Sequence, residues 1–195
     1  MKRNLLNISY LIDARQFQKI LIMITLSFIL VMSSGTAVLA ERHEGRHRSP
    51  EWHYSRMPAR GAFINRIPRT AYRINHGGNY YHYRNGLFYR PYNSGFVIVA
   101  PPIGLRVGFL PRGYLSFNIG GFPYYYYGGT YYIQREREYE VVAPPLGAIV
   151  ESIPRGYEKI QVNGQTFYSF DGIQYKPILR DGEIWYEVIK SPNWK

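Results

Sequence analysis

One short motif in the chain has the residue types and spacing of a metal-dependent hydrolase. His43-Glu44-Gly45-Arg46-His47 follows the pattern HExxH, in which two histidines on one helical face bind zinc and the glutamate activates water. Gly45 disfavours a helix, and Ser49-Pro50 would end one directly after the motif. No third ligand is evident. We therefore interpret the match as fortuitous and predict no catalytic residues.

The same region permits a different metal site if the chain is cut after Ala40. The new terminus would read Glu41-Arg42-His43. Its free amine, two deprotonated amides and imidazole would form a square-planar nitrogen site for Cu(II) or Ni(II). His47 and His53 are candidate additional ligands, for zinc as well. An envelope metal-binding protein that uses His43, His47 and His53 is therefore our alternative function.

Tyrosine offers a second kind of chemistry, namely recognition. The chain contains 20 Tyr, 19 Gly and 13 Pro, and the densest aromatic cluster spans residues 124–132. Amphipathic rings on a surface suit carbohydrate or protein partners, whereas the same rings inside a thin β core only need partners for their hydroxyls. The candidate ligand surface comprises Tyr125, Tyr127, Tyr132, Tyr168 and Tyr175.

Composition excludes several classes of protein. The chain has no cysteine, which rules out a disulfide scaffold, a thiolate metal site and a cysteine nucleophile. No GxSxG or SxxK motif of a serine hydrolase stands out. The net charge is +11, and residues 41–90 alone carry +7, so the basicity is an N-terminal feature. It favours anionic polymers as partners, but no nucleic-acid-binding motif is present and we predict no nucleic acid.

Residues 1–40 have the three parts of a secretory signal peptide. A basic segment precedes the apolar run 20–32, and Val38-Leu39-Ala40 ends with small residues at the cleavage positions. The alternative is a retained anchor, for which a 13-residue apolar run is short. We predict export to the periplasm, the cell envelope or the medium, with no transmembrane span after cleavage.

A repeat of 43 residues runs through the remaining chain. Residues 96–133 and 139–176 share 14 identities in 38 positions without a gap, and a more diverged copy lies 43 residues earlier. We expect a flexible basic arm at 41–60 and a β-repeat domain at 61–195. Its units cover about 54–90, 97–133 and 140–176, and a closing strand follows at 184–190.

Each unit is predicted to be an all-β meander of short strands. Tyr139–Ala143 is expected to begin the third copy, because Pro144-Pro145 stops the strand. Asn163-Gly164 and Asp171-Gly172 indicate two-residue type I′ hairpins, which fix the register. The expected pairs are Ile160–Phe167, Phe117–Tyr124 and Ile74–Tyr81 on one face, and Tyr168–Tyr175, Tyr125–Tyr132 and His82–Tyr89 on the other.

The motifs VAPPxG and PRGY, followed by paired tyrosines after glycine, resemble an exported bacterial family of unknown function, domain of unknown function 6515. They stand at Val99–Gly104 and Val142–Gly147, and at Pro111–Tyr114 and Pro154–Tyr157. The resemblance covers roughly Tyr80 to Ile189. It implies bacterial origin and export, and it supplies no activity and no site residues.

These observations favour a non-catalytic structural or binding module of the cell envelope. The expected partner is a cell-wall polymer, another polysaccharide or an envelope protein. Metal binding through the histidine-containing arm is the runner-up, and an enzyme of unrecognised type is the third hypothesis. No cofactor is predicted, and the sequence does not specify an oligomeric state.

Overall fold

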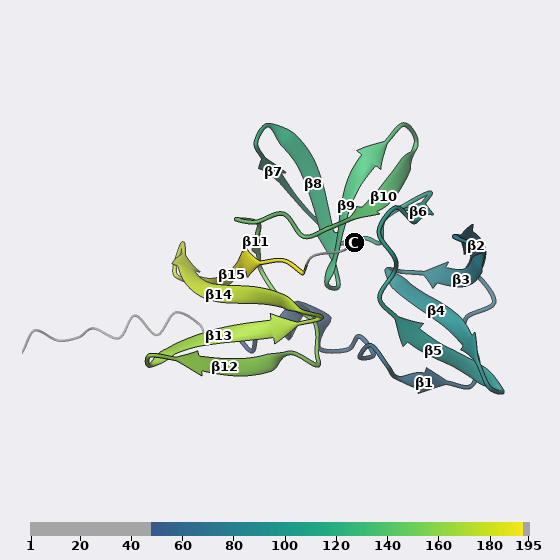
Figure 1. The fold of residues 1–195 in the computed structure, drawn as a ribbon, viewed down its shortest axis with the longest axis horizontal. Coiled ribbons are helices and arrows are strands. Elements are labelled where there is room, and N and C mark those ends of the chain that lie inside the picture. Colours follow the sequence, from purple (N-terminus) through teal and green to yellow (C-terminus); the bar gives the residue numbers. More distant parts are fainter. Residues whose placement is uncertain (1–47, 193–195) are drawn as a thin grey trace, which may run out of the picture. The chain divides into compact units, whose positions relative to one another are not determined.

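The computed structural model describes residues 48–192, which form three five-stranded antiparallel sheets (Figure 1). The predicted all-β fold of repeated meanders is confirmed. Nothing helical within these residues is long and apolar enough to cross a bilayer. The predicted signal segment 1–40 lies outside the described residues, as do His43 and His47.

Every sheet combines a two-residue strand with a four-stranded meander. The first sheet contains β1 (Phe63–Ile64), β2 (Tyr72–His76), β3 (Asn79–Arg84), β4 (Leu87–Tyr92) and β5 (Gly95–Val99). The second contains β6 (Arg106–Val107), β7 (Leu115–Ile119), β8 (Phe122–Tyr127), β9 (Thr130–Arg135) and β10 (Glu138–Val142). The third contains β11 (Ile149–Val150), β12 (Glu158–Val162), β13 (Gln165–Phe170), β14 (Ile173–Arg180) and β15 (Glu183–Lys190). In each sheet the short strand pairs with the last strand of the meander.

The hairpins have the backbone geometry that their residues require. Asn163 and Gly164 have φ angles of 50° and 76°, and Asp171 and Gly172 have 50° and 77°, as a type I′ turn demands. Such turns leave no freedom of register. All six predicted cross-strand pairs are confirmed: Ile160–Phe167, Phe117–Tyr124, Ile74–Tyr81, Tyr168–Tyr175, Tyr125–Tyr132 and His82–Tyr89.

The fourth meander strand lies in a different unit from the one that the sequence repeat suggests. The segment Tyr139–Ala143, expected to begin the third copy, contributes to β10, which pairs with β9 and β6 of the second sheet. A tight turn keeps β10 beside β9, and the prolines that follow it cannot donate ladder hydrogen bonds. The closing strand expected at 184–190 forms most of β15 and takes the same place in the third sheet.

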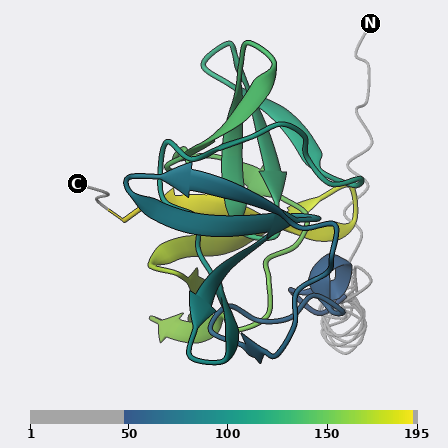
Figure 2. The same cartoon turned by 90° about the vertical axis from the view of Figure 1, so that its right-hand side faces the viewer.

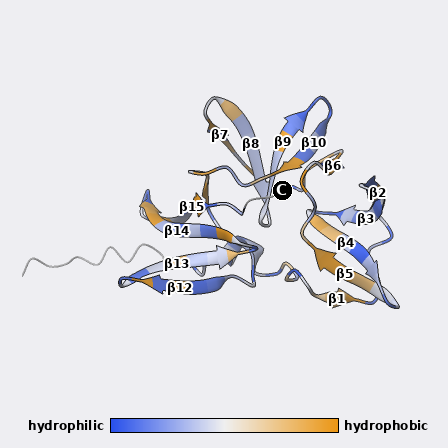
Figure 3. Ribbon diagram, viewed as in Figure 1, coloured by the Kyte–Doolittle hydropathy of each residue, from blue (hydrophilic) through white to orange (hydrophobic). Residues whose placement is uncertain are grey.

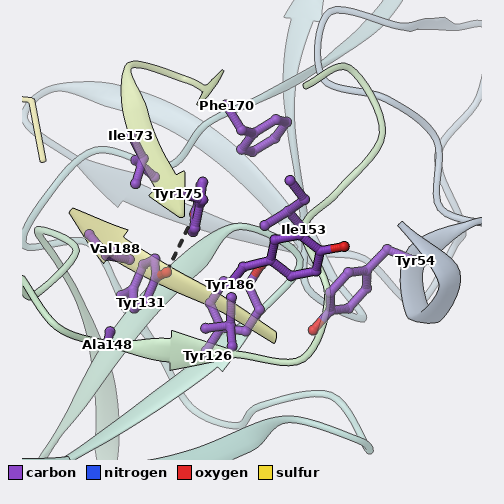
Figure 4. Packing of buried hydrophobic residues seen from close by; sticks show 11 residues of the cluster. Tyr54, Tyr126, Tyr131, Ala148, Ile153, Phe170, Ile173, Tyr175, Tyr186 and Val188 are labelled. Atoms are coloured by element: carbon purple, nitrogen blue, oxygen red, sulfur yellow. Dashed lines mark hydrogen bonds between the residues drawn. The ribbon is translucent and has the colours of Figure 1, made fainter. Parts of the chain in front are cut away.

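The second sheet packs on both neighbours. Tyr131 and Tyr132 are consecutive on β9, so their side chains point to opposite faces. Tyr131 is buried with residues of the third sheet, and its hydroxyl lies 3.4 Å from that of Tyr175 (Figure 4). Tyr132 is buried with Tyr83 and other residues of the first sheet. Because tyrosine has intermediate hydropathy, β8 is pale in Figure 3 although it supplies core rings.

The two interfaces between sheets are built alike. The β3–β4 turn places Gly86 against Tyr127 and Pro111 of the second sheet's unit, and the β8–β9 turn places Gly129 against Phe170 and Pro154 of the third. A Cβ atom at Gly129 would lie 2.5 Å from the Phe170 ring and 2.9 Å from Pro154. Both turns therefore need glycine for close approach as well as for backbone conformation.

The third sheet differs at the face that a fourth unit would contact. One repeat beyond Tyr126 and Tyr131 stand Ser169 and Gln174, both half-buried. The turn glycine, Gly172, faces Pro192 of its own unit. Two tyrosines of the face that joins the second sheet to the third are thus replaced by polar residues, although Ile160 and Phe167 lie on the same face of the third sheet.

Residues 48–60, which belong to the segment expected to be a flexible arm, are packed instead. They include the 3-10 helix η1 (Trp52–Tyr54), drawn in dark blue in Figure 2. Tyr54 is 2% exposed and belongs to the core between the second and third sheets. Its ring lies 6.0 Å from Tyr126 and 5.4 Å from Tyr127, measured between ring centroids. Burial of this aromatic side chain explains the difference from the expectation.

Candidate binding surface

A cluster of three tyrosines lies on the face of the second sheet that is turned toward the first. Tyr114 precedes β7, Tyr125 lies on β8, and Tyr139 lies on β10. The ring centroids of Tyr114 and Tyr125 are 5.6 Å apart, and those of Tyr125 and Tyr139 are 5.2 Å apart, both edge to face. This arrangement is the favourable one for aromatic pairs. Gln134 lies beside the cluster and accepts a hydrogen bond from the Tyr125 hydroxyl at 3.4 Å.

The third sheet carries the same cluster at the equivalent positions. Tyr157 and Tyr168 stand one repeat after Tyr114 and Tyr125. Tyr186 corresponds to Tyr139, because Tyr186 lies opposite Val150 as Tyr139 lies opposite Val107. The centroid distances in the third sheet are 5.3 and 5.5 Å. We call these the second-sheet and third-sheet tyrosine clusters.

The third-sheet tyrosine cluster is covered by the N-terminal segment. Burial and then a hydrogen bond to the Glu51 carboxylate raise the pKa of Tyr157 to about 12. Burial and the charge of Glu51 also raise the pKa of Tyr168 and of Tyr186. The Glu51 carboxylate thus lies beside the Tyr157 hydroxyl and near Tyr168 and Tyr186, while its buried Oε2 atom has no hydrogen-bond partner within residues 48–192.

Hydrogen bonds hold this segment along residues 151–155. The backbone N–H of Ile153 donates to the Pro50 carbonyl at 2.9 Å, and the Trp52 indole donates to the Glu151 carbonyl at 3.1 Å. The Ser152 hydroxyl also donates to the Pro50 carbonyl, at 2.7 Å. Further along, the Arg155 guanidinium donates to the Ser55 carbonyl at 3.2 Å.

The second-sheet tyrosine cluster is open by comparison. Phe109 and Tyr114 are 46% and 43% exposed, whereas Ser152 and Ile153 of the third unit are 0% exposed. Tyr139 is half-buried, whereas its counterpart Tyr186 is buried. The aromatic rings of the second unit are therefore available to solvent and to partners.

A separate polar site lies where the three units meet. The Arg60 guanidinium forms an ion pair with Asp171, donates to the Thr130 hydroxyl at 3.1 Å and lies over the Phe170 ring. Desolvation lowers the pKa of Arg60. The adjoining cavity has a volume of about 30 Å³, which suits about one water molecule rather than a substrate. These bonds join a first-unit segment to turns of the second and third sheets, so the site is structural.

Two of the five predicted ligand-surface tyrosines are core residues. Tyr132 and Tyr175 are both 0% exposed, so neither can line a surface, and this correction follows from sheet packing on both faces. Tyr125 and Tyr168 lie in the two tyrosine clusters, although the N-terminal segment covers Tyr168. Tyr127 is half-buried against Tyr54 and the β3–β4 turn.

The described residues include only one of the three candidate metal ligands. The Nδ1 atom of His53 lies 2.9 Å from Glu151 Oε1. His43 and His47, and with them the HExxH motif, lie outside the described residues. Within residues 48–192 no three His, Cys, Asp or Glu side chains are placed to share a metal ion.

Sequence reasoning missed Tyr114, Tyr139, Tyr157 and Tyr186 as members of a site. The signal was present, because Tyr114 and Tyr157 end the two PRGY motifs and Tyr139 and Tyr186 occupy matching strands. What linked them to Tyr125 and Tyr168 was not local. Tyr139 is separated from β8 by the intervening strand β9.

Comparison with known proteins gives one match. The model of a family of unknown function, DUF6515, matches residues 40–192, which confirms the resemblance seen in the motifs. No curated protein and no solved structure matches the chain.

Proposed function

Because the chain belongs to DUF6515, a family of unknown function, we propose its role from the structure: a non-catalytic binding module of the bacterial cell envelope. The observation that carries this proposal is the open second-sheet tyrosine cluster, Tyr114, Tyr125 and Tyr139, beside its covered counterpart. Partners are a cell-wall polymer or an envelope protein. The secretory features of residues 1–40 support export to the periplasm, the envelope or the medium.

The chemistry of the cluster supports recognition rather than turnover. Exposed tyrosines combine an apolar face with a hydroxyl and lose little conformational freedom when they bind. Burial raises the pKa of Tyr139, which keeps its hydroxyl a neutral hydrogen-bond donor at physiological pH. The cluster therefore offers contact area and hydrogen-bond donors to a partner.

The test is co-sedimentation of residues 41–195 with purified cell-wall sacculi across a salt series. Tyr114→Ala and Tyr125→Ala should lower the bound fraction at 1 M salt, where the Debye length of about 3 Å suppresses nonspecific attraction. Tyr80→Ala is the matched control, because Tyr80 is 49% exposed on the first sheet.

A chain that begins at residue 48 loses residues 41–47, whose two Arg and two Glu give no net charge, and it keeps both the basic residues and the packed segment. Binding that persists at high salt in this chain and falls with Tyr125→Ala supports the proposal. Binding that disappears with salt and does not depend on Tyr125 means attraction of a basic chain to an anionic polymer. No sedimentation even at low salt removes the cell wall as the partner.

A further inference from the structure

The contacts of the N-terminal segment on the third unit define a site for a short peptide that forms a helical turn, η1, between its two anchored ends. Its backbone is held at Pro50 by the Ile153 N–H, and at Ser55 by the Arg155 guanidinium. Its Glu51 carboxylate faces the third-sheet tyrosine cluster. The site on the third unit thus contacts one stretch of backbone and one acidic side chain.

The second unit repeats the parts of this site at the same spacing. Leu110 stands one repeat before Ile153, Arg112 before Arg155, and Tyr114 before Tyr157. The Leu110 N–H has no backbone acceptor within residues 48–192, and Arg112 is exposed. The backbone donor, the guanidinium and the Tyr114 hydroxyl are therefore present and open to a partner, whereas the Tyr125 hydroxyl donates to Gln134.

Phe109 shows which portion of a peptide the second unit would take. The Tyr83 hydroxyl donates to the Phe109 carbonyl at 3.1 Å, just as the Tyr126 hydroxyl donates to the Ser152 carbonyl at 2.8 Å. The Phe109 ring packs on Tyr83, 5.9 Å between centroids, as Tyr54 packs on Tyr126. In the second unit, Phe109 thus occupies the position that corresponds to Tyr54. The positions that correspond to Pro50 and Glu51 are left open.

The charges of the two sites are arranged differently. Glu151, which pairs with His53 at 2.9 Å, is replaced by Gly108 at the equivalent position. Glu138, which corresponds to Trp185, instead acts on the Tyr72 hydroxyl that Gly108 contacts. Arg112 is kept, and its hydrogen bonds to a partner are of the stronger, charge-assisted kind.

We propose that the second unit binds a short turn-forming peptide segment of a partner protein, with an acidic side chain beside Tyr114, Tyr125 and Tyr139. This inference rests on the proposed binding function and names the chemistry of its partner. The Leu110 N–H holds the peptide backbone, the Tyr114 hydroxyl donates to the carboxylate, and Arg112 holds a carbonyl further along. The N-terminal segment bound on the third unit is the model for this interaction.

A synthetic peptide with the sequence of residues 48–55, blocked at both ends and dye-labelled, is the probe. Fluorescence anisotropy with residues 41–195 should show saturable binding at one site. A Glu51→Gln peptide should bind about tenfold more weakly or worse, because a charged hydrogen-bond acceptor is lost. Equal affinity of the two peptides overturns carboxylate recognition.

Two protein variants locate the bound peptide. Tyr114→Phe, which removes one hydroxyl from the open site, should weaken binding, whereas the matched Tyr157→Phe should not. The opposite result means that the peptide displaces the chain's own segment from the third unit, and it overturns the proposal, as does no binding. Circular dichroism melts check that both variants fold. Sacculus binding that depends on Tyr125 without peptide binding overturns this inference alone and leaves the proposed function standing.

Discussion

The hydroxyls of Tyr126, Tyr131 and Tyr175 lie in the same core that excludes water from their rings. The Tyr126 hydroxyl donates to the Ser152 carbonyl at 2.8 Å, and those of Tyr131 and Tyr175 lie 3.4 Å apart. Each ring buries a large apolar area, and each hydroxyl must stay neutral to remain there. The core is therefore stable only while its tyrosines keep their protons.

We predict that the free energy of unfolding falls as the pH rises above about 10. Burial raises the pKa of Tyr175 to about 12, against 10.0 for an ordinary tyrosine. Above pH 10 the unfolded chain releases these protons while the folded chain holds them, so stability declines up to the folded-state pKa. Urea unfolding between pH 8 and 11, followed by tryptophan fluorescence, measures this. A midpoint that stays constant across that range contradicts the prediction.

The metal-binding hypothesis also depends on individual residues. If the mature chain begins at Glu41, it should bind one Cu(II) through its terminal amine and His43, with the visible absorption of a square-planar nitrogen site. His43→Ala should abolish that absorption, and His76→Ala serves as the matched control. Mass spectrometry of the exported protein establishes the terminus, and a terminus other than Glu41 removes the site.

At the level of elements, the turns of the β-hairpins carry the contacts between sheets. Gly129 has a φ of 82°, and a Cβ atom there would collide with Phe170 and Pro154. Gly164 has a φ of 76°, but a Cβ atom at that position would meet nothing within 4 Å. The two glycines thus share a backbone conformation and differ in packing.

Gly129→Ala should destabilise the protein more than Gly164→Ala does. The control measures the cost of a positive φ in a residue with a side chain, about 1 kcal/mol. The excess at Gly129, about 1–3 kcal/mol, measures the packing of the turn against the third unit. Denaturant midpoints of the two variants provide the comparison. Equal losses of stability would mean that the interface accommodates the added methyl group without a free-energy cost.

Strand register was predictable because it is local. The two-residue turns at Asn163-Gly164 and Asp171-Gly172 fix which residues lie opposite each other. The packing of sheets was not local, so the sequence did not show that Tyr132 and Tyr175 are enclosed. The boundary of each unit was hidden for the same reason, because β10 lies equally near the second and third copies along the chain. Only its pairing with β6 and β9 assigns it to the second sheet.

At the scale of the described molecule, the N-terminal segment acts as part of the third unit. Tyr54 is buried against Tyr126 between the second and third sheets, whereas the corresponding ring of the second unit, Phe109, packs on Tyr83 and is 46% exposed. The guanidinium of Arg60 joins turns of both later sheets through Thr130 and Asp171. Residues before the first strand therefore complete an interface about a hundred residues away in sequence.

Truncation should separate residues 41–47 from this packed segment. A chain that begins at residue 48 should melt at the same temperature as residues 41–195. A chain that begins at residue 58 loses Tyr54 and should be destabilised by about 3–5 kcal/mol, as expected for removal of a buried aromatic side chain. Differential scanning calorimetry of the three chains measures this, and equal melting of all three contradicts the packing described here.

Two positions of the third sheet bear on growth of the array. Each internal junction joins an aromatic face to a proline-bearing turn, so a duplicated unit inserted between existing copies would meet surfaces like those already present. A unit appended after the third would meet Ser169 and Gln174 instead of two tyrosines. Duplication of a unit is therefore accommodated better between existing copies than after the third.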